Sequence, residues 1–222
     1  MSRAHTLRAL AALLSYPDEA LQAALPELGV LLSAQPQLTS TQASLRALMT
    51  NLAAQDLFEA QSAYINTFDR GRSACLNLFE HVHGDSRDRG QAMVDLMSLY
   101  ERHGLKLLGT ELPDYLPAFL EFASLFPGDE ALAHIREVAP ILASIRNTLT
   151  RRSSPYAAIF SALLCLIGEG ASAADHSANI PEDNCAQALD EQYAEAPVTF
   201  MGNCAPQSPR AEQPIHFVGR RA

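Results

Sequence analysis

The spacing of apolar residues places the strongest constraint on how this chain can fold. In one segment after another, apolar residues recur every three or four positions, as Leu7, Leu10 and Leu14 do near the start. This spacing gathers them on one face of an α-helix. No stretch shows the sustained alternation of apolar and polar residues between turn residues that is typical of a strand. The pattern therefore predicts an all-α fold.

Proline positions divide the apolar pattern into separate helices. We expect Pro26 to split the second helix into two halves and Pro140 to bend a long helix that begins at Asp129. Pro113 and Pro155 are each placed to open a helix. The helix after Pro155 is apolar almost all round, which predicts a central position in a bundle. The expected helices cover approximately residues 7–14, 18–32, 41–52, 56–68, 86–103, 113–120, 129–152 and 155–167.

The composition changes near residue 168. Residues 169–222 carry eight acidic and three basic side chains, so this segment supplies a net charge of −5 to the −9 of the whole chain. Its polar, Pro- and Ser-containing sequence cannot bury enough apolar surface to offset the entropy lost on ordering. We expect a single-domain helical bundle over residues 1–168. For residues 169–222 we expect a low-complexity acidic tail that is disordered or loosely docked.

Charge and composition argue against several classes of protein. Nucleic-acid binding requires clustered basic residues, whereas this chain is acidic and Lys106 is its only lysine. The longest uncharged run, residues 153–168, is shorter than the roughly 20 apolar residues of a membrane span. Four cysteines lie far apart without a C-x-x-C pair, and the N-terminal apolar run is interrupted by Arg8. We expect a cytoplasmic protein with reduced thiols and no membrane insertion.

Residues 64–122 are unusually rich in charged and aromatic residues and carry a resemblance to a known family. The runs FDRGRSACLNLFEHVHGDSRDRGQAMVDLMSLYERHGL and ELPDYLPAFLEF, together with SYPDE at 15–19, resemble the NarJ type of molybdenum cofactor assembly chaperone, also called the nitrate reductase delta subunit. This type belongs to the wider TorD/DmsD-like redox-enzyme maturation chaperones. Their signature of Glu, Pro, Asp and usually His is matched by Glu111, Pro113, Asp114 and, as a departure, Tyr115. The nitrate reductase branch tolerates that tyrosine.

The resemblance implies an all-α chaperone that is not itself an enzyme. Such proteins bind the N-terminus of the catalytic (alpha) subunit of respiratory nitrate reductase and assist insertion of bis-molybdopterin guanine dinucleotide. They hold no cofactor stably, and cofactor-biosynthesis proteins are further candidate partners. The alternative within the same superfamily is a chaperone for another molybdoenzyme with a twin-arginine leader.

A chaperone of this kind needs a groove with apolar walls and a few polar anchors. Candidate wall residues, each of which could equally be part of the core, are Tyr64, Phe68, Leu76, Phe79, Met93, Leu96, Met97 and Tyr100. Candidate acidic anchors, which could instead pair with neighbouring arginines, are Asp69, Glu80, Asp85, Asp88 and Glu111. The signature residues Glu111, Pro113, Asp114 and Tyr115 are expected either to border the partner site as a hinge or to form only a cap and turn.

Two further interpretations remain open for the same region. Arg70, Arg72, Arg87 and Arg89 could contact the phosphates of a guanine dinucleotide, although the chain has no phosphate-binding glycine motif. His81 and His83 with Cys75 could suggest a metal or a nucleophile, but side chains two positions apart on a helix point away from each other. We assign no catalytic and no metal-binding residue.

Overall fold

The computed structural model describes residues 3–83, 88–107 and 111–169, and this part of the chain is helical. An isolated antiparallel bridge between Asn77 and Tyr115 is the only β-type pairing within it, so the predicted all-α fold is confirmed. The α-helices are α1 (Arg3–Leu14), α2 (Glu19–Ser33), α3 (Gln42–Ala54), α4 (Leu57–Phe68), α5 (Leu78–Val82), α6 (Asp88–Arg102), α7 (Leu116–Ala123), α8 (Gly128–Glu137), α9 (Ala139–Arg151) and α10 (Ala157–Leu166). Two short 3₁₀ helices, η1 (Pro36–Leu38) and η2 (Arg72–Ala74), lie in the connections.

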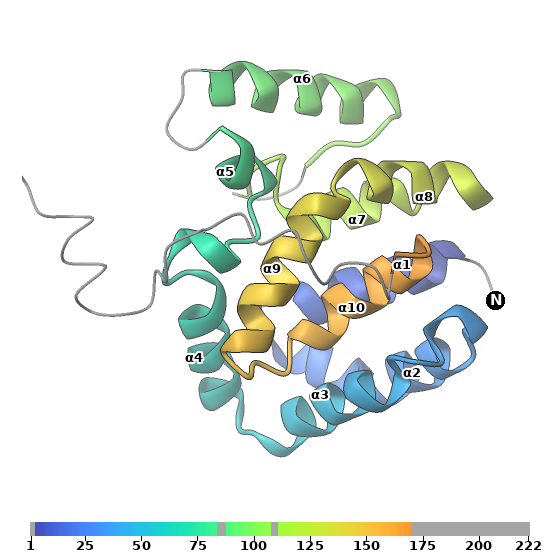
Figure 1. The fold of residues 1–222 in the computed structure, drawn as a ribbon, viewed down its shortest axis with the longest axis vertical. Coiled ribbons are helices and arrows are strands. Elements are labelled where there is room, and N and C mark those ends of the chain that lie inside the picture. Colours follow the sequence, from blue (N-terminus) through green and yellow to red (C-terminus); the bar gives the residue numbers. More distant parts are fainter. Residues whose placement is uncertain (1–2, 84–87, 108–110, 170–222) are drawn as a thin grey trace, which may run out of the picture.

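Helix α10 lies in the middle of the bundle, as its sequence predicts (Figure 1). It packs against α1, α3 and α9, and α1 in turn packs along α7. Apolar side chains on all sides of α10, among them Ile159, Phe160 and Leu163, are fully buried. A helix that is apolar all round is stable only where neighbours cover every face, and this requirement places α10 at the centre.

Side-chain caps define the starts of two helices. The carboxylate of Asp18 accepts a hydrogen bond of 2.7 Å from the backbone N–H of Leu21, and that of Asp56 accepts one of 2.9 Å from Glu59. Each cap satisfies a donor that the first helical turn leaves without a partner. The predicted helix start at residue 56 is therefore confirmed.

Two predictions based on proline were wrong. Helix α2 is continuous through Pro26, whose ring is exposed, so the missing hydrogen bond lies on the solvent side and the helix persists. Residues 129–152 form two helices rather than one bent helix. The chain breaks at Val138, because Pro140 lacks the N–H that would continue the ladder, and α8 and α9 run in different directions (Figure 1).

The expected role of Pro113 was also wrong. Helix α7 begins at Leu116, and it is Pro117 that occupies its first turn. Pro113 lies in the turn before the helix. The backbone N–H of Leu116 bonds the carbonyl of Leu76, and this pairing keeps the helix from beginning at an earlier residue. The connection before α7 thus pairs with the connection before α5.

Helix α6 buries little of its apolar face. Its apolar residues were expected to lie either on the wall of a partner groove or in the core, and Tyr100 is the only buried residue of this helix. Met93 and Leu96 are half-buried, and Met97 is 42% exposed. In Figure 1, α6 lies at the top of the view, apart from the central bundle. The expected start of this helix at residue 86 falls outside the described residues.

The remaining predictions about organisation concern the end of the chain. Helix α10 ends at Leu166, close to the expected boundary at residue 168, and residues 170–222 lie outside the described part. Among the described helices, none combines the length and apolar character needed to cross a bilayer. Of the four cysteines, Cys75 and Cys165 are described, and both are free thiols.

Candidate functional site

The signature residues 111–115 are held by the segment before α5. The N–H of Leu78 donates to the carbonyl of Asp114 (3.0 Å), and the N–H of Leu116 donates to the carbonyl of Leu76 (2.9 Å). These bonds flank the isolated bridge between Asn77 and Tyr115. The hinge, defined here as residues 111–115, is therefore fastened to the chain that leaves α4.

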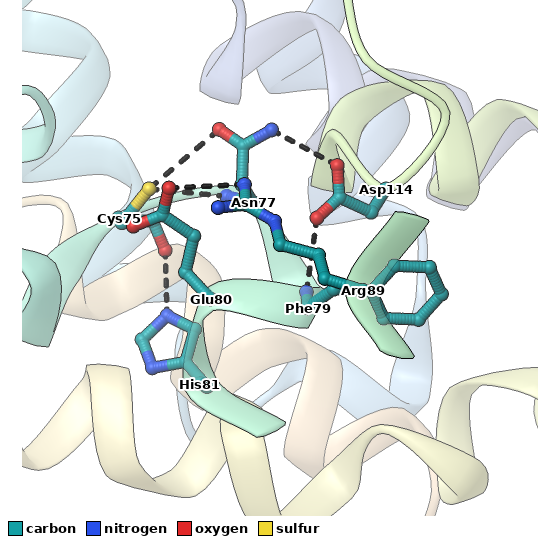
Figure 2. A network of polar contacts seen from close by, with 7 residues as sticks. All are labelled: Cys75, Asn77, Phe79, Glu80, His81, Arg89 and Asp114. Carbon is teal, nitrogen blue, oxygen red and sulfur yellow. Dashed lines mark hydrogen bonds and ion pairs between the residues drawn. The ribbon is translucent and has the colours of Figure 1, made fainter. Parts of the chain in front are cut away.

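Asp114 occupies the centre of this junction and is completely buried. One carboxylate oxygen accepts a hydrogen bond from the side-chain amide of Asn77 (3.1 Å), and the other accepts one from the backbone N–H of Phe79 (2.9 Å), as Figure 2 shows. The second bond satisfies a donor in the first turn of α5. An acidic residue near the start of a helix usually stabilises that same helix. Asp114 instead stabilises α5, which precedes it in the sequence.

Two tyrosines connect the hinge to the core. The hydroxyl of Tyr64 donates to the carbonyl of Leu14 (2.7 Å), so the hydroxyl of Tyr115 donates to Tyr64 across 2.9 Å. On the other side, the hydroxyl of buried Tyr100 donates to the carbonyl of Pro113 (2.8 Å). Burial raises the pKa of all three phenols, so they remain protonated donors at neutral pH.

A pocket of about 240 Å³, which we call the hinge pocket, opens beside Tyr115. It brings together residues that lie far apart in the sequence, from the end of α1, from α4, from the segment before α5 and from the hinge. Its lining residues are Tyr16, Tyr64, Phe68, Asp69, Cys75, Leu76, Asn77, Glu111 and Tyr115. Six of the residues that the sequence nominated for partner binding therefore meet in one cavity: Tyr64, Phe68, Asp69, Leu76, Glu111 and Tyr115.

A larger groove of about 550 Å³ runs between α1, α7 and the segment after α6, and we call it the α7 groove. Glu111 and Tyr115 line both this groove and the hinge pocket, so the two are adjacent. Its apolar lining comes from Tyr100, Leu105, Leu107, Pro117, Ala118, Phe122 and Leu125. Its polar and charged lining comes from Arg8, Ser15, Lys106, Glu111 and Glu121.

Sequence reasoning did not nominate most residues of the α7 groove. Leu125 is 45% exposed although it is apolar, and Arg8 reaches α7 by donating to the hydroxyl of Ser124 (3.1 Å). Both features depend on the packing of α1 against α7, which periodicity does not reveal. The one signal available in the sequence was the apolar Leu125 itself, which follows the apolar helix α7 after Ser124.

The remaining candidates lie on a different part of the surface. Glu80 forms an ion pair with Arg89 (3.0 Å), and this pair joins α5 to α6 (Figure 2). For Glu80 the alternative of pairing with a neighbouring arginine is therefore the one observed. Glu80 and Arg72 line a third groove, between α5 and α9, of about 520 Å³. Phe79 is half-buried, with its ring against that of His83. Of the other arginines, Arg70 is exposed after α4, and residue 87 lies outside the described part, as does the acid at 85.

No converging set of metal ligands occurs in the described ranges, where no three or more His, Cys, Asp or Glu side chains gather. The Nε2 atom of His81 bonds the carbonyl of Cys75 at 2.8 Å (Figure 2), which ties the last turn of α5 to the loop before this helix. Burial raises the pKa of the Cys75 thiol to about 11, so at neutral pH this sulfur is a poor nucleophile.

The chain is similar in fold to a putative redox enzyme maturation protein from Archaeoglobus fulgidus, with a TM-score of 0.53 at 21% identity over 76% of this chain and 95% of that one. The family model for the nitrate reductase delta subunit matches residues 16–162, and the chain belongs to this family. The family assignment made from residues 64–122 is confirmed.

Relatives with assigned names agree with the family. The chain is 42% identical over 195 residues to the nitrate reductase molybdenum cofactor assembly chaperone NarJ of Escherichia coli K12, covering 86% of this chain and 83% of that protein. It is 41% identical over 199 residues to the probable chaperone NarW of the same organism, covering 88% and 83%. A probable NarJ of Bacillus subtilis is 29% identical over 164 residues, covering 73% and 88%.

Proposed function

We propose that this protein is an assembly chaperone of respiratory nitrate reductase that acts by binding and not by catalysis. It binds the N-terminal segment of the apo catalytic subunit in the cytoplasm and keeps that subunit open for insertion of the molybdenum cofactor, bis-molybdopterin guanine dinucleotide. It holds no cofactor itself. Proteins of cofactor biosynthesis meet it through the bound catalytic subunit.

The observation that carries this proposal is the α7 groove and its position. An amphipathic peptide helix is recognised when its apolar face lies in a groove with apolar walls. The α7 groove offers such walls, together with two basic and two acidic side chains, and it borders the hinge that characterises the family. Charges of both signs fix the direction in which a peptide lies, because a reversed peptide would meet like charges.

The buried members of the signature act in this proposal by positioning. Asp114 and Tyr100 use their polar atoms on α5 and on Pro113, so they hold the hinge in place beside the groove. Glu111 and Tyr115 line the groove and the hinge pocket and are therefore the signature residues that contact the peptide.

Calorimetric titration with a synthetic peptide of the catalytic subunit's N-terminal segment tests the proposal. Leu125→Asp places a charge on the apolar wall of the groove and should weaken binding by about ten-fold or more, since the buried apolar contact is lost and a charge is desolvated. Val30→Asp on α2 is the matched control, because Val30 is also an exposed apolar residue but lies away from the groove. Equal affinities of Leu125→Asp and the unmodified protein would refute the groove as the binding site.

The identity of the partner is tested with the same protein. A leader peptide of another molybdoenzyme that carries a twin-arginine motif is titrated in parallel. We expect the nitrate reductase peptide to bind more tightly, and the opposite order would favour the other molybdoenzyme as the true partner.

A further inference from the structure

We propose that the hinge pocket is a subsite for one arginine side chain of the segment that lies in the α7 groove. The inference rests on the proposed function and adds the chemistry of one anchoring residue, its place on the chaperone and the side chains that hold it.

The walls of the hinge pocket suit a flat cation. The ring of Tyr64 lies 5.5 Å from that of Tyr16 and 4.9 Å from that of Phe68, centroid to centroid, and Tyr115 closes another side. Tyr64 and Phe68 are almost fully buried, whereas Tyr16 is 46% exposed and Tyr115 is half-buried, so the rings of Tyr16 and Tyr115 are the ones accessible to a bound group. Aromatic faces attract cations through the negative charge density above the ring, and arginine is the commoner partner in such pairs.

Two carboxylates line the same pocket without a partner. Neither Asp69 nor Glu111 forms a side-chain hydrogen bond or an ion pair with any described residue. Both act on the same phenol: burial raises the pKa of Tyr115, and the negative charges of Glu111 and Asp69 raise it further. Both carboxylates therefore lie near Tyr115, in the lining of the same pocket.

Asp69 is exposed but partly desolvated, and its charge has no described partner. Desolvation raises the pKa of Asp69, and no described cation counteracts this effect, although Arg70 is the next residue. A carboxylate that has lost water without gaining a partner is stabilised when a cation arrives. The pocket thus favours a positively charged group over a neutral one.

The distribution of charge also assigns the cation to the hinge pocket and not to the α7 groove. In the groove the charges of Arg8 and Lys106 offset those of its two glutamates, so it has no net preference for a cation, whereas the hinge pocket contains two carboxylates and no basic side chain. The pocket volume of about 240 Å³ holds roughly eight waters at about 30 Å³ each, which a long side chain can displace. A guanidinium has five N–H donors in a planar fork, so it can serve both carboxylates while stacking on a ring.

The test is a double-mutant cycle by calorimetric titration on the full chain. Asp69→Asn and Glu111→Gln remove the charges while keeping the shapes, and both residues are exposed, so the fold tolerates the changes. Each arginine of the synthetic N-terminal peptide is replaced in turn by citrulline, which is nearly isosteric and neutral. Asp95→Asn on α6, whose side chain accepts only from Gln91 (2.9 Å), is the control variant.

We expect one citrulline position to lower the affinity of the unmodified protein by about ten-fold or more, the effect of losing a charge-assisted hydrogen bond. The same replacement should have less than a two-fold effect on the doubly neutral variant Asp69→Asn/Glu111→Gln. Lysine at that position should restore only part of the affinity, because it keeps the charge but not the fork.

Two failures are distinguishable. If the unmodified protein does not bind the peptide, the proposed function fails. If it binds, but the two neutral variants match Asp95→Asn in affinity or every citrulline effect persists in the doubly neutral variant, the arginine subsite is refuted and the proposed function stands.

Discussion

Substitution of Asp114 by alanine should destabilise the fold strongly while leaving the surface of the protein unchanged. The side chain is fully buried, and its two oxygens accept hydrogen bonds from Asn77 and from the N–H of Phe79. Alanine removes both bonds, and it leaves the donors of Asn77 and Phe79 without the partner that replaced water for them.

The expected size follows from these two bonds. A hydrogen bond to a charged acceptor contributes about 1.5–3 kcal/mol, and an orphaned donor costs a similar amount, so we expect Asp114→Ala to lower the free energy of unfolding by about 3–5 kcal/mol. Asp114→Asn keeps one acceptor oxygen for Phe79 and should cost about half as much. Since domains are stable by about 5–15 kcal/mol, the asparagine variant should remain folded even if the alanine variant does not.

Urea unfolding followed by circular dichroism measures both variants. Asp95→Ala is the control, because this exposed aspartate bonds only Gln91 and its loss should change the free energy of unfolding by less than about 0.5 kcal/mol. If Asp114→Ala were no less stable than Asp95→Ala, the hydrogen bonds of Asp114 would not be what fixes the hinge.

Three other perturbations test separate parts of the structure. Tyr64→Phe removes the donor to the Leu14 carbonyl and should cost about 1–2 kcal/mol, seen by calorimetry as a fall of about 2–8 °C in Tm; an unchanged Tm would contradict the bond. Pro26→Ala should restore a helix hydrogen bond in α2 and raise the free energy of unfolding by about 2 kcal/mol, and a less stable variant would show that the proline is needed there. Burial raises the pKa of Cys75 to about 11, so about one thousandth of this thiol should be ionised at pH 8. Iodoacetamide should therefore alkylate Cys75 slowly at pH 8 and faster as the pH rises towards 11, which peptide-resolved mass spectrometry at the two ends of this pH range checks. An alkylation rate at pH 8 equal to that of the unfolded chain would refute the expectation.

Local signals in the sequence were sufficient for the fold class and for several helices. The apolar pattern of α10 needed no tertiary information, because a helix that is apolar on every side and too short to span a bilayer is stable only in a protein core. The same holds for the cap at Asp56, which acts on the helix directly after it. In both cases the cause and its effect lie within one turn or one helix.

Predictions failed where a residue acts on a distant segment. The signature residues were expected to border the partner site or to form only a cap and turn, but Asp114 bonds the backbone N–H of Phe79 in α5, 35 positions earlier. Pro113 was expected to open α7, and the pairing of Leu116 with Leu76 delayed that start. For the apolar face of α6 the alternatives of groove wall and core stayed open, because amphipathic spacing does not say how closely another element covers the face.

The candidate site shows the same division. The family resemblance and residue chemistry nominated Tyr64, Asp69 and Glu111, yet only the fold brings them into one pocket. Tyr16 completes that pocket from the end of α1, where no periodic or charge pattern marks it. Their roles in partner binding stay predictions until the titrations are made.

The sparse attachment of α6 has a consequence for how the protein unfolds. Tyr100 is the one side chain that this helix buries. The N-terminal end of α6 is joined to α5 through the ion pair between Arg89 and Glu80. Little apolar surface would become exposed if α6 detached, so its opening costs far less than global unfolding. The amide protons of α6 should exchange with solvent through this local opening, while those of α10 exchange only when the whole bundle unfolds. Detachment of α6 would also remove Tyr100 from the wall of the α7 groove, so the local opening of this helix would widen the groove for an incoming chain.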